Sequence, residues 1–267
     1  MSSRCTCRHP AYTCRLIPYN VGPRDIGTRA VSRDDLGARP SALAPTPRAF
    51  DGARRCRPWA GVVGSTGLLR EWEMNLVNVG YKSVNCYALE AGAGYLLIDV
   101  GMPGTYGEFV SVLKRKSVPL ERIRFLVVTH FHPDHCGIAQ EVKNAGVTLL
   151  LGDIQERRLA EANRTLAKFP GYLEITDVGN AIVATDDRAA WKATTGIDGV
   201  MLHTPGHSDD SVTAVIDGVG AFVGDLRPSE AYIGQAVALA AESWQKIRAE
   251  GAWKAFPAHG PAFDLDT

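Results

Sequence analysis

The stretch "VVTHFHPDHCG", residues 127–137, holds three of the chain's seven histidines and an aspartate directly after an apolar run. The apolar run is typical of a buried β-strand, so the polar residues begin where this strand ends. Alternate residues of an extended chain face the same side, which lets His130 and His132 present their imidazoles to one point. A proline then turns the chain, and Asp134, at the expected N-cap, and His135 open a helix. Imidazole and carboxylate suit Zn, Fe or Mn, so the stretch predicts a metal site.

Four other polar side chains also follow apolar segments. His207 comes after "GVMLHTPG", Asp225 after "AFVG" and His259 after "WKAFPA", while Asp99 follows "YLLI". The argument made for the opening stretch therefore extends to these four residues, and we expect them at the same site.

From residue 74 onward, short apolar segments alternate with helical patterns. Strands are predicted at 75–79, 86–91, 94–101, 124–130, 147–151, 199–204, 211–216, 221–225 and 253–258. Helices are predicted at 104–116 and at about 135–145, 153–168 and 235–249, the last with Ala240, Trp244 and Ile247 on one side. No fixed-period repeat is visible, so we expect one domain of sheets flanked by helices from residue 74 to 267.

Residues 1–73 differ from the rest of the chain in composition. They hold twelve Arg, no Lys and six acidic residues, and are rich in Pro, Gly, Ser and Ala. Because no apolar periodicity is present, we predict a disordered Arg-rich extension. A nucleic-acid-binding arm and a metal knuckle in "CTCRHPAYTC" are the functional alternatives, and neither has a specific pattern. Met74 suggests a further hypothesis, namely that residues 1–73 are not made natively. A mass measurement showing that the native protein begins at residue 1 would exclude this hypothesis.

Composition and charge limit the classes of partner. The whole chain has a formal net charge of zero, which argues against a nucleic-acid or anionic-membrane partner. No apolar run reaches the length of a signal-peptide core or a membrane span, so we expect a cytoplasmic protein. Since nucleic-acid and membrane partners are disfavoured, we expect a small-molecule substrate. The oligomeric state is left open.

The motifs with possible metal ligands occur in order along the chain: the opening stretch, "TPGH" at His207, "GD" at Asp225 and "AHG" at His259. With these motifs, residues 74–267 resemble the metallo-β-lactamase superfamily. The resemblance implies an α+β fold, an αββα sandwich of two mixed β-sheets flanked by helices. It also implies two metals, most often zinc, with iron and manganese as options. One metal would take His130, His132 and His207, the other Asp134, His135 and His259. Asp225 would bridge both metals, and Asp99 would orient a ligand.

A site of this kind implies hydrolysis. Two divalent ions share and activate a water, and Asp134 would act as the catalytic carboxylate that holds the hydroxide proton and passes it to the leaving group. The ligand set with a bridging Asp225 resembles glyoxalase II and the lactonases, so we expect a small ester, lactone or thioester substrate. His203 is interpreted as structural, and Cys136 as a small buried thiol.

Other members of the superfamily remain as alternatives. β-Lactamases of this fold place Cys or Ser where this chain has Asp225, so β-lactam hydrolysis is kept only as a weak activity. Too few residues follow His259 for the glutathione-binding domain of the hydroxyacylglutathione hydrolases. RNA-processing relatives need a basic arm, yet residues 74–267 carry a formal charge of −6 and only the basic run "KRK" at 114–116. Persulfide dioxygenases, with one iron, are the competing enzyme class, and a degenerate binding module is the non-enzymatic one.

Overall fold

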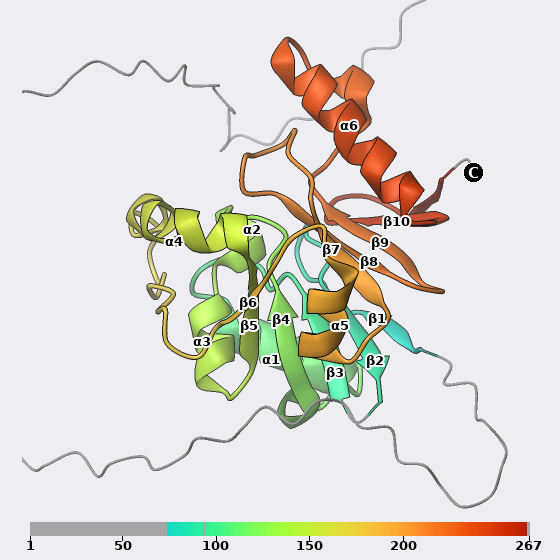
Figure 1. The fold of residues 1–267 in the computed structure, drawn as a ribbon. Coiled ribbons are helices and arrows are strands. Elements are labelled where there is room, and N and C mark those ends of the chain that lie inside the picture. Colours follow the sequence, from blue (N-terminus) through green and yellow to red (C-terminus); the bar gives the residue numbers. More distant parts are fainter. Residues whose placement is uncertain (1–73, 93, 266–267) are drawn as a thin grey trace, which may run out of the picture. The chain divides into compact units, whose positions relative to one another are not determined.

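The computed structural model describes residues 74–92 and 94–265, which form two β-sheets packed face to face with helices on the outer faces (Figure 1). This is the αββα sandwich of two mixed sheets expected from the sequence. The predictions made for residues 1–73 lie outside the described residues.

The first sheet has six strands in the order β1-β2-β3-β4-β5-β6. The strands are β1 (Leu76–Asn78), β2 (Tyr87–Ala91), β3 (Gly94–Ile98), β4 (Ile123–Val127), β5 (Thr148–Gly152) and β6 (Ala181–Val183). The first three pair antiparallel, and β3 to β6 pair parallel. Because parallel strands need crossover connections, helices lie between them in sequence and cover the outer face.

The second sheet has five strands in the order β11-β10-β9-β8-β7. The strands are β7 (Gly199–His203), β8 (Val212–Ile216), β9 (Gly220–Gly224), β10 (Lys254–Pro257) and β11 (Phe263–Asp264). Only β9 and β10 pair parallel, and the long helix between them makes the crossover.

Six α-helices and two short 3₁₀ helices are found in the described residues. They are α1 (Tyr106–Arg115), η1 (Leu120–Arg122), α2 (Pro133–Cys136), α3 (Ala139–Asn144), α4 (Asp153–Leu166), α5 (Arg188–Thr195), η2 (Ser229–Ala231) and α6 (Gln235–Ala249). None of the described helices has the length and apolar character needed to cross a membrane.

The core has three apolar layers: one between the two sheets and one on the outer, helix-covered face of each sheet. Alternate residues of a strand point to opposite faces of its sheet and so enter different layers. In β4, Leu126 packs on the helical side with Phe109 of α1. Its neighbours Phe125 and Val127 face the other way and pack between the sheets with Phe222 of β9. Burial on both faces of the strand explains why its sequence is a continuous apolar run.

A third apolar layer joins α6 to the second sheet. Ala240, Trp244 and Ile247, the residues predicted to share one side of this helix, are buried against Val215 and Val223. The helix also has the predicted bounds of 235–249.

Two parts of the secondary structure differ from the predictions. The helix expected at about 135–145 is divided into α2 and α3 by Gly137 and Ile138. A Cβ at Gly137 would lie 2.3 Å from Pro103, so the chain makes a close approach here. The short elements β6, α5 and β11 were not predicted, and β6 and α5 follow α4 in the segment between β5 and β7.

Candidate metal centre

The seven side chains predicted as metal ligands converge beyond the carboxyl ends of the strands. They form two groups whose possible ligand atoms lie within 4.8 Å of one another: His130, His132, His207 and Asp225 in one, and Asp134, His135 and His259 in the other. The division into two groups is the one that the resemblance implied. Each group combines imidazole and carboxylate donors, the chemistry that zinc, iron and manganese accept.

Asp225 lies between the two groups. Its Oδ1 atom is 3.4 Å from the Nε2 atoms of both His135 and His259. Its Oδ2 atom is 3.5 Å from Nε2 of His207. One carboxylate therefore turns one oxygen to each group, which is the arrangement that a bridging ligand requires.

Several buried polar atoms at the site have no hydrogen-bond partner among the described residues. Nε2 of His130, Nε2 of His135 and Oδ1 of Asp225 are buried and have no hydrogen-bond partner among the described residues. In addition, His132 Nδ1 and His207 Nε2 point at each other across 3.0 Å. Buried polar atoms are nearly always paired, so unpaired nitrogen and oxygen atoms that face one another fit bound cations.

Asp99 sets the orientation of His135. The backbone amide and the hydroxyl of Thr129 donate to Asp99 at 2.7 and 2.9 Å, and His135 Nδ1 donates to Asp99 Oδ2 at 2.9 Å. The proton on Nδ1 leaves the lone pair of His135 on Nε2, which faces the second group. Asp99 is buried and has a positive φ of 58°, so the strand end holds it in a strained conformation.

His259 is oriented by the backbone instead. Its Nδ1 donates to the carbonyl oxygen of Ser83 at 2.7 Å. Its Nε2 lies 3.2 Å from Asp134 Oδ2. The turn between β1 and β2 therefore selects the ring nitrogen that His259 offers to the second group.

Two further contacts were not predicted from the sequence. Asp210 Oδ2 accepts a hydrogen bond of 2.7 Å from the amide of Phe131, between the two histidines of the opening stretch. Gly224 has a φ of 56°, and a Cβ at this position would lie 2.5 Å from Thr129 Oγ1. Both contacts join segments distant in sequence. The glycine before Asp225 was the one local signal available.

The pKa values show a divided electrostatic environment. Burial lowers the pKa of His135, but the carboxylates of Asp99 and Asp225 outweigh this effect and raise the pKa to about 10. Burial lowers the pKa of His207 to about 4, despite the nearby Asp225. Burial favours the neutral acid at Asp225, but its histidine neighbours lower its pKa to about 2. At neutral pH the first group thus has an imidazole lone pair beside a carboxylate, and the second has carboxylates that attract positive charge.

Three residues near the centre have other positions or roles. Cys136 is buried, and its thiol donates to the carbonyl of His132 at 3.2 Å, as a small packed thiol would. His203 Nε2 pairs with the carbonyl of Asp209 at 2.9 Å and belongs to neither group. The prediction of Asp134 as a helix N-cap is wrong, because α2 begins at Pro133 and His132 is the N-cap residue. Proline fits the first helical position, so the cap lies two residues earlier than the sequence suggested.

The fold and this cluster define an αββα metalloprotein. The sequence model of the Metallo-beta-lactamase superfamily matches residues 79–259. The chain belongs to this family, and the coarse assignment that follows is a metallohydrolase of this fold.

Curated relatives are about one quarter identical to the chain over the residues that align. "Beta-lactamase-like protein 2 homolog" of Caenorhabditis elegans is 26% identical over 193 residues, covering 68% of this chain and 58% of the relative. "N-acyl homoserine lactonase" of Bacillus cereus is 25% identical over 166 residues, covering 54% of this chain and 60% of the relative. The chain therefore spans less than two thirds of the length of these relatives.

Solved structures confirm the fold. MEM-A1, a subclass B3 metallo-beta-lactamase from a soil metagenome library, aligns with a TM-score of 0.52 at 19% identity over 68% of this chain and 75% of that chain. A metallo-beta-lactamase from Cronobacter sakazakii aligns with a TM-score of 0.55 at 16% identity over 69% of this chain and 78% of that chain. At these identities the likeness establishes the architecture alone.

Proposed function

We propose that the protein is a two-metal hydrolase that acts on a small ester, lactone or thioester. The observation that carries this proposal is the position of Asp225, with one oxygen toward each of two donor groups. A site for a single cation would not need a carboxylate shared between two groups. The lactonase named among the relatives supports an acyl substrate.

We assign the donor atoms from their orientation. His130 Nε2, His132 Nδ1, His207 Nε2 and Asp225 Oδ2 would hold one cation, and Asp134 Oδ2, His135 Nε2, His259 Nε2 and Asp225 Oδ1 the other. When bound, two such cations lower the pKa of a shared water and polarise the carbonyl of the substrate.

Asp134 is the proposed catalytic residue. Its Oδ2 atom faces His135 and His259 at 3.6 and 3.2 Å, and its side chain is partly exposed. Its neighbours keep it charged: burial raises its pKa, but the hydrogen bond from His259 and the charge of His135 make the net shift downward. A carboxylate that is ionised and open to solvent on one side can accept a proton from the nucleophile and deliver it to the leaving group.

Asp225 also bears on the choice of substrate. The β-lactamases that the motifs resemble have Cys or Ser at this position, so we propose an acyl substrate other than a β-lactam. The negative charge of residues 74–267 likewise opposes an RNA substrate.

Metal analysis followed by a substrate screen tests the proposal. We expect about two zinc per chain and turnover of thioesters, lactones or esters by the zinc-loaded protein. Phosphodiesters and a chromogenic β-lactam complete the panel. One iron per chain with consumption of oxygen would identify a dioxygenase instead, and no bound metal would identify a binding module.

A further inference from the structure

A hollow lies between the turn that joins β1 to β2 and the end of α1. Its volume is about 510 Å³. Its lining includes Tyr81, Lys82, Ser83 and Asn85 of the turn, Lys116 after α1, and Gly260. We call it the lysine hollow, because its charged lining residues are two lysines.

The lysine hollow adjoins the candidate metal centre through His259. The Nε2 atom of this ring faces the second donor group, and Nδ1 donates to the carbonyl of Ser83, a lining residue. Gly260, the next residue, also lines the hollow, and its carbonyl accepts a hydrogen bond of 2.8 Å from Asn85. The hollow thus begins on the side of the His259 ring that faces away from the second donor group.

The charged residues that line this hollow are both positive. No acidic residue lines it. Lys82 pairs at 3.2 Å with Glu108, but both side chains are more than half exposed, so the pair is weak and easily exchanged. Lys116 makes no ion pair with any of the residues 74–92 and 94–265. This cationic region stands on a part of the chain whose formal charge is −6.

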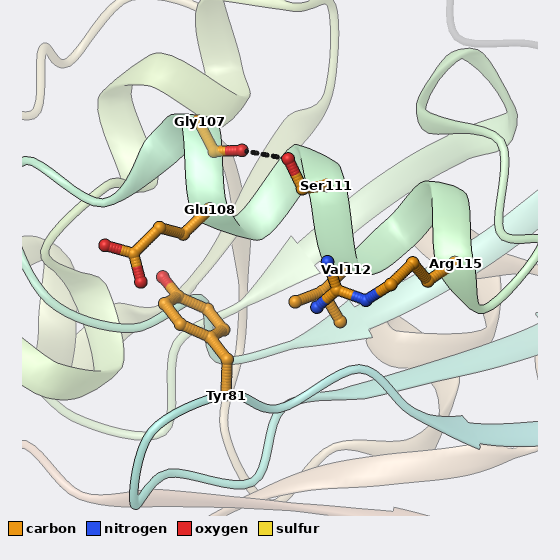
Figure 2. A pocket seen from close by; sticks show the side chains of 6 residues that line it. All are labelled: Tyr81, Gly107, Glu108, Ser111, Val112 and Arg115. Atoms are coloured by element: carbon orange, nitrogen blue, oxygen red, sulfur yellow. Dashed lines mark hydrogen bonds between the residues drawn. The ribbon is translucent and has the colours of Figure 1, made fainter.

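A second hollow of about 400 Å³ shares Tyr81 with the first. Figure 2 shows the Arg115 side chain extending along α1 toward Val112, with the Tyr81 ring on the facing turn. Arg115 and Lys116 belong to the basic run at the end of α1. Basic residues at a helix C-terminus are expected from the helix dipole alone. The run gains significance because two of its members line hollows, while Lys114 lines neither.

We propose that the lysine hollow binds a negatively charged group of the substrate, so that the substrate is an anionic ester, lactone or thioester. This inference rests on the proposed function. Lys82 and Lys116 would hold the anion, and the side-chain amide of Asn85 keeps the wall of the hollow fixed to Pro257 and Gly260. The charged group would lie on the His259 side of the bond that is broken.

Matched thioesters test the inference on the zinc-loaded protein. One pair shares N-acetylcysteamine as the thiol and differs in the acyl group, succinyl against butanoyl. A second pair shares the butanoyl group and differs in the thiol, 3-mercaptopropanoate against N-acetylcysteamine. We expect a higher kcat/KM for the charged member of at least one pair. The preference should fall about threefold to tenfold in the variant with Lys82→Met and Lys116→Met, as expected for exposed charges, and should weaken with added salt.

The control is Lys114→Met, which removes one positive charge from the helix end that carries Lys116 and lies outside both hollows. An equal loss of preference in this variant, or no preference in the unchanged protein, would overturn the inference. Titration calorimetry with glutarate gives a readout that does not depend on turnover. Weaker glutarate binding in the double variant alone supports the hollow, and equal binding in all three proteins refutes it. Absence of turnover with every thioester, ester and lactone would refute the proposed function instead.

Discussion

The carboxylate of Asp210 accepts a hydrogen bond of 2.7 Å from the backbone amide of Phe131, the residue between His130 and His132. A second bond runs beside it, from the amide of Val212 to the carbonyl of Thr129 at 2.8 Å. The segment that follows His207 is thereby fastened to the segment that carries the other two histidines of the first group.

Asp210→Ala should therefore weaken the first metal site. We expect about a tenfold to hundredfold loss of zinc affinity, the usual effect of removing a residue that orients ligands, measured by competition with a chromophoric chelator. Asp210→Asn keeps a side-chain oxygen that can accept from Phe131 and should recover most of the affinity. Its neighbour Asp209, which is exposed and pairs with Arg158 at 3.4 Å, supplies the control Asp209→Ala. Equal losses in the two alanine variants would contradict the role of Asp210.

Asp225→Ala should affect both metals, because each of its oxygens faces a different group. We expect the loss of at least one zinc per chain and of hydrolysis, measured by elemental analysis of protein equilibrated with zinc and by turnover. His207→Ala provides the comparison, since this residue belongs to one group only. If Asp225→Ala retains two metals, the carboxylate does not bridge them.

The sequence was sufficient to predict the layers of the fold and the convergence of the seven polar side chains. The strand predicted at 124–130 was readable because burial on both faces makes its centre, residues 125–128, a continuous apolar run. The polar residues at their ends were readable because metal chemistry restricts the residue types. Asp225 and His259 are far from the opening stretch in the chain. They could still be predicted to belong to the same site, because each is a ligand-type residue that follows an apolar strand.

Contacts within the site could not be read in this way. Asp210 is one of two adjacent aspartates in a turn, and nothing local indicates which of them accepts from Phe131. The Ser83 carbonyl that orients His259 is a backbone atom, so no residue type signals its role. The short strand β6 has three residues, too few for a periodicity to appear.

Gly224→Ala should distort the site without removing a ligand. A side chain here is strained at a φ of 56°, and its Cβ would lie 2.5 Å from Thr129 Oγ1, which donates to Asp99. Gly218 has a φ of 75° with nothing within 4 Å, so Gly218→Ala measures the cost of backbone strain alone. That strain costs about 1 to 2 kcal/mol. We expect a larger loss of unfolding free energy, and a loss of zinc affinity, in Gly224→Ala only. Equal behaviour of the two variants would mean that Thr129 moves aside at no cost.

Removal of the metals should reveal a pH dependence that originates at His135. Burial lowers its pKa, but Asp99 and Asp225 raise it from 6.5 to about 10. The folded protein then binds this proton more tightly than the unfolded chain does. Its contribution to stability is complete below the unfolded pKa of about 6.5 and is lost as the pH rises through about 10.

Urea unfolding in the presence of a chelator should accordingly show lower stability at pH 10 than at pH 7. Zinc should reduce this decline, because the cation occupies the place of the proton and its binding requires the neutral imidazole. Asp99→Asn, which removes the charge that favours protonation of His135, separates this effect from the titration of Lys and Tyr residues elsewhere. In Asp99→Asn the pKa of His135 in the folded protein should lie closer to its unfolded value. The loss of stability of the metal-free protein between pH 7 and pH 10 should therefore be smaller in this variant. An unchanged decline would assign the alkaline instability to groups outside the metal centre.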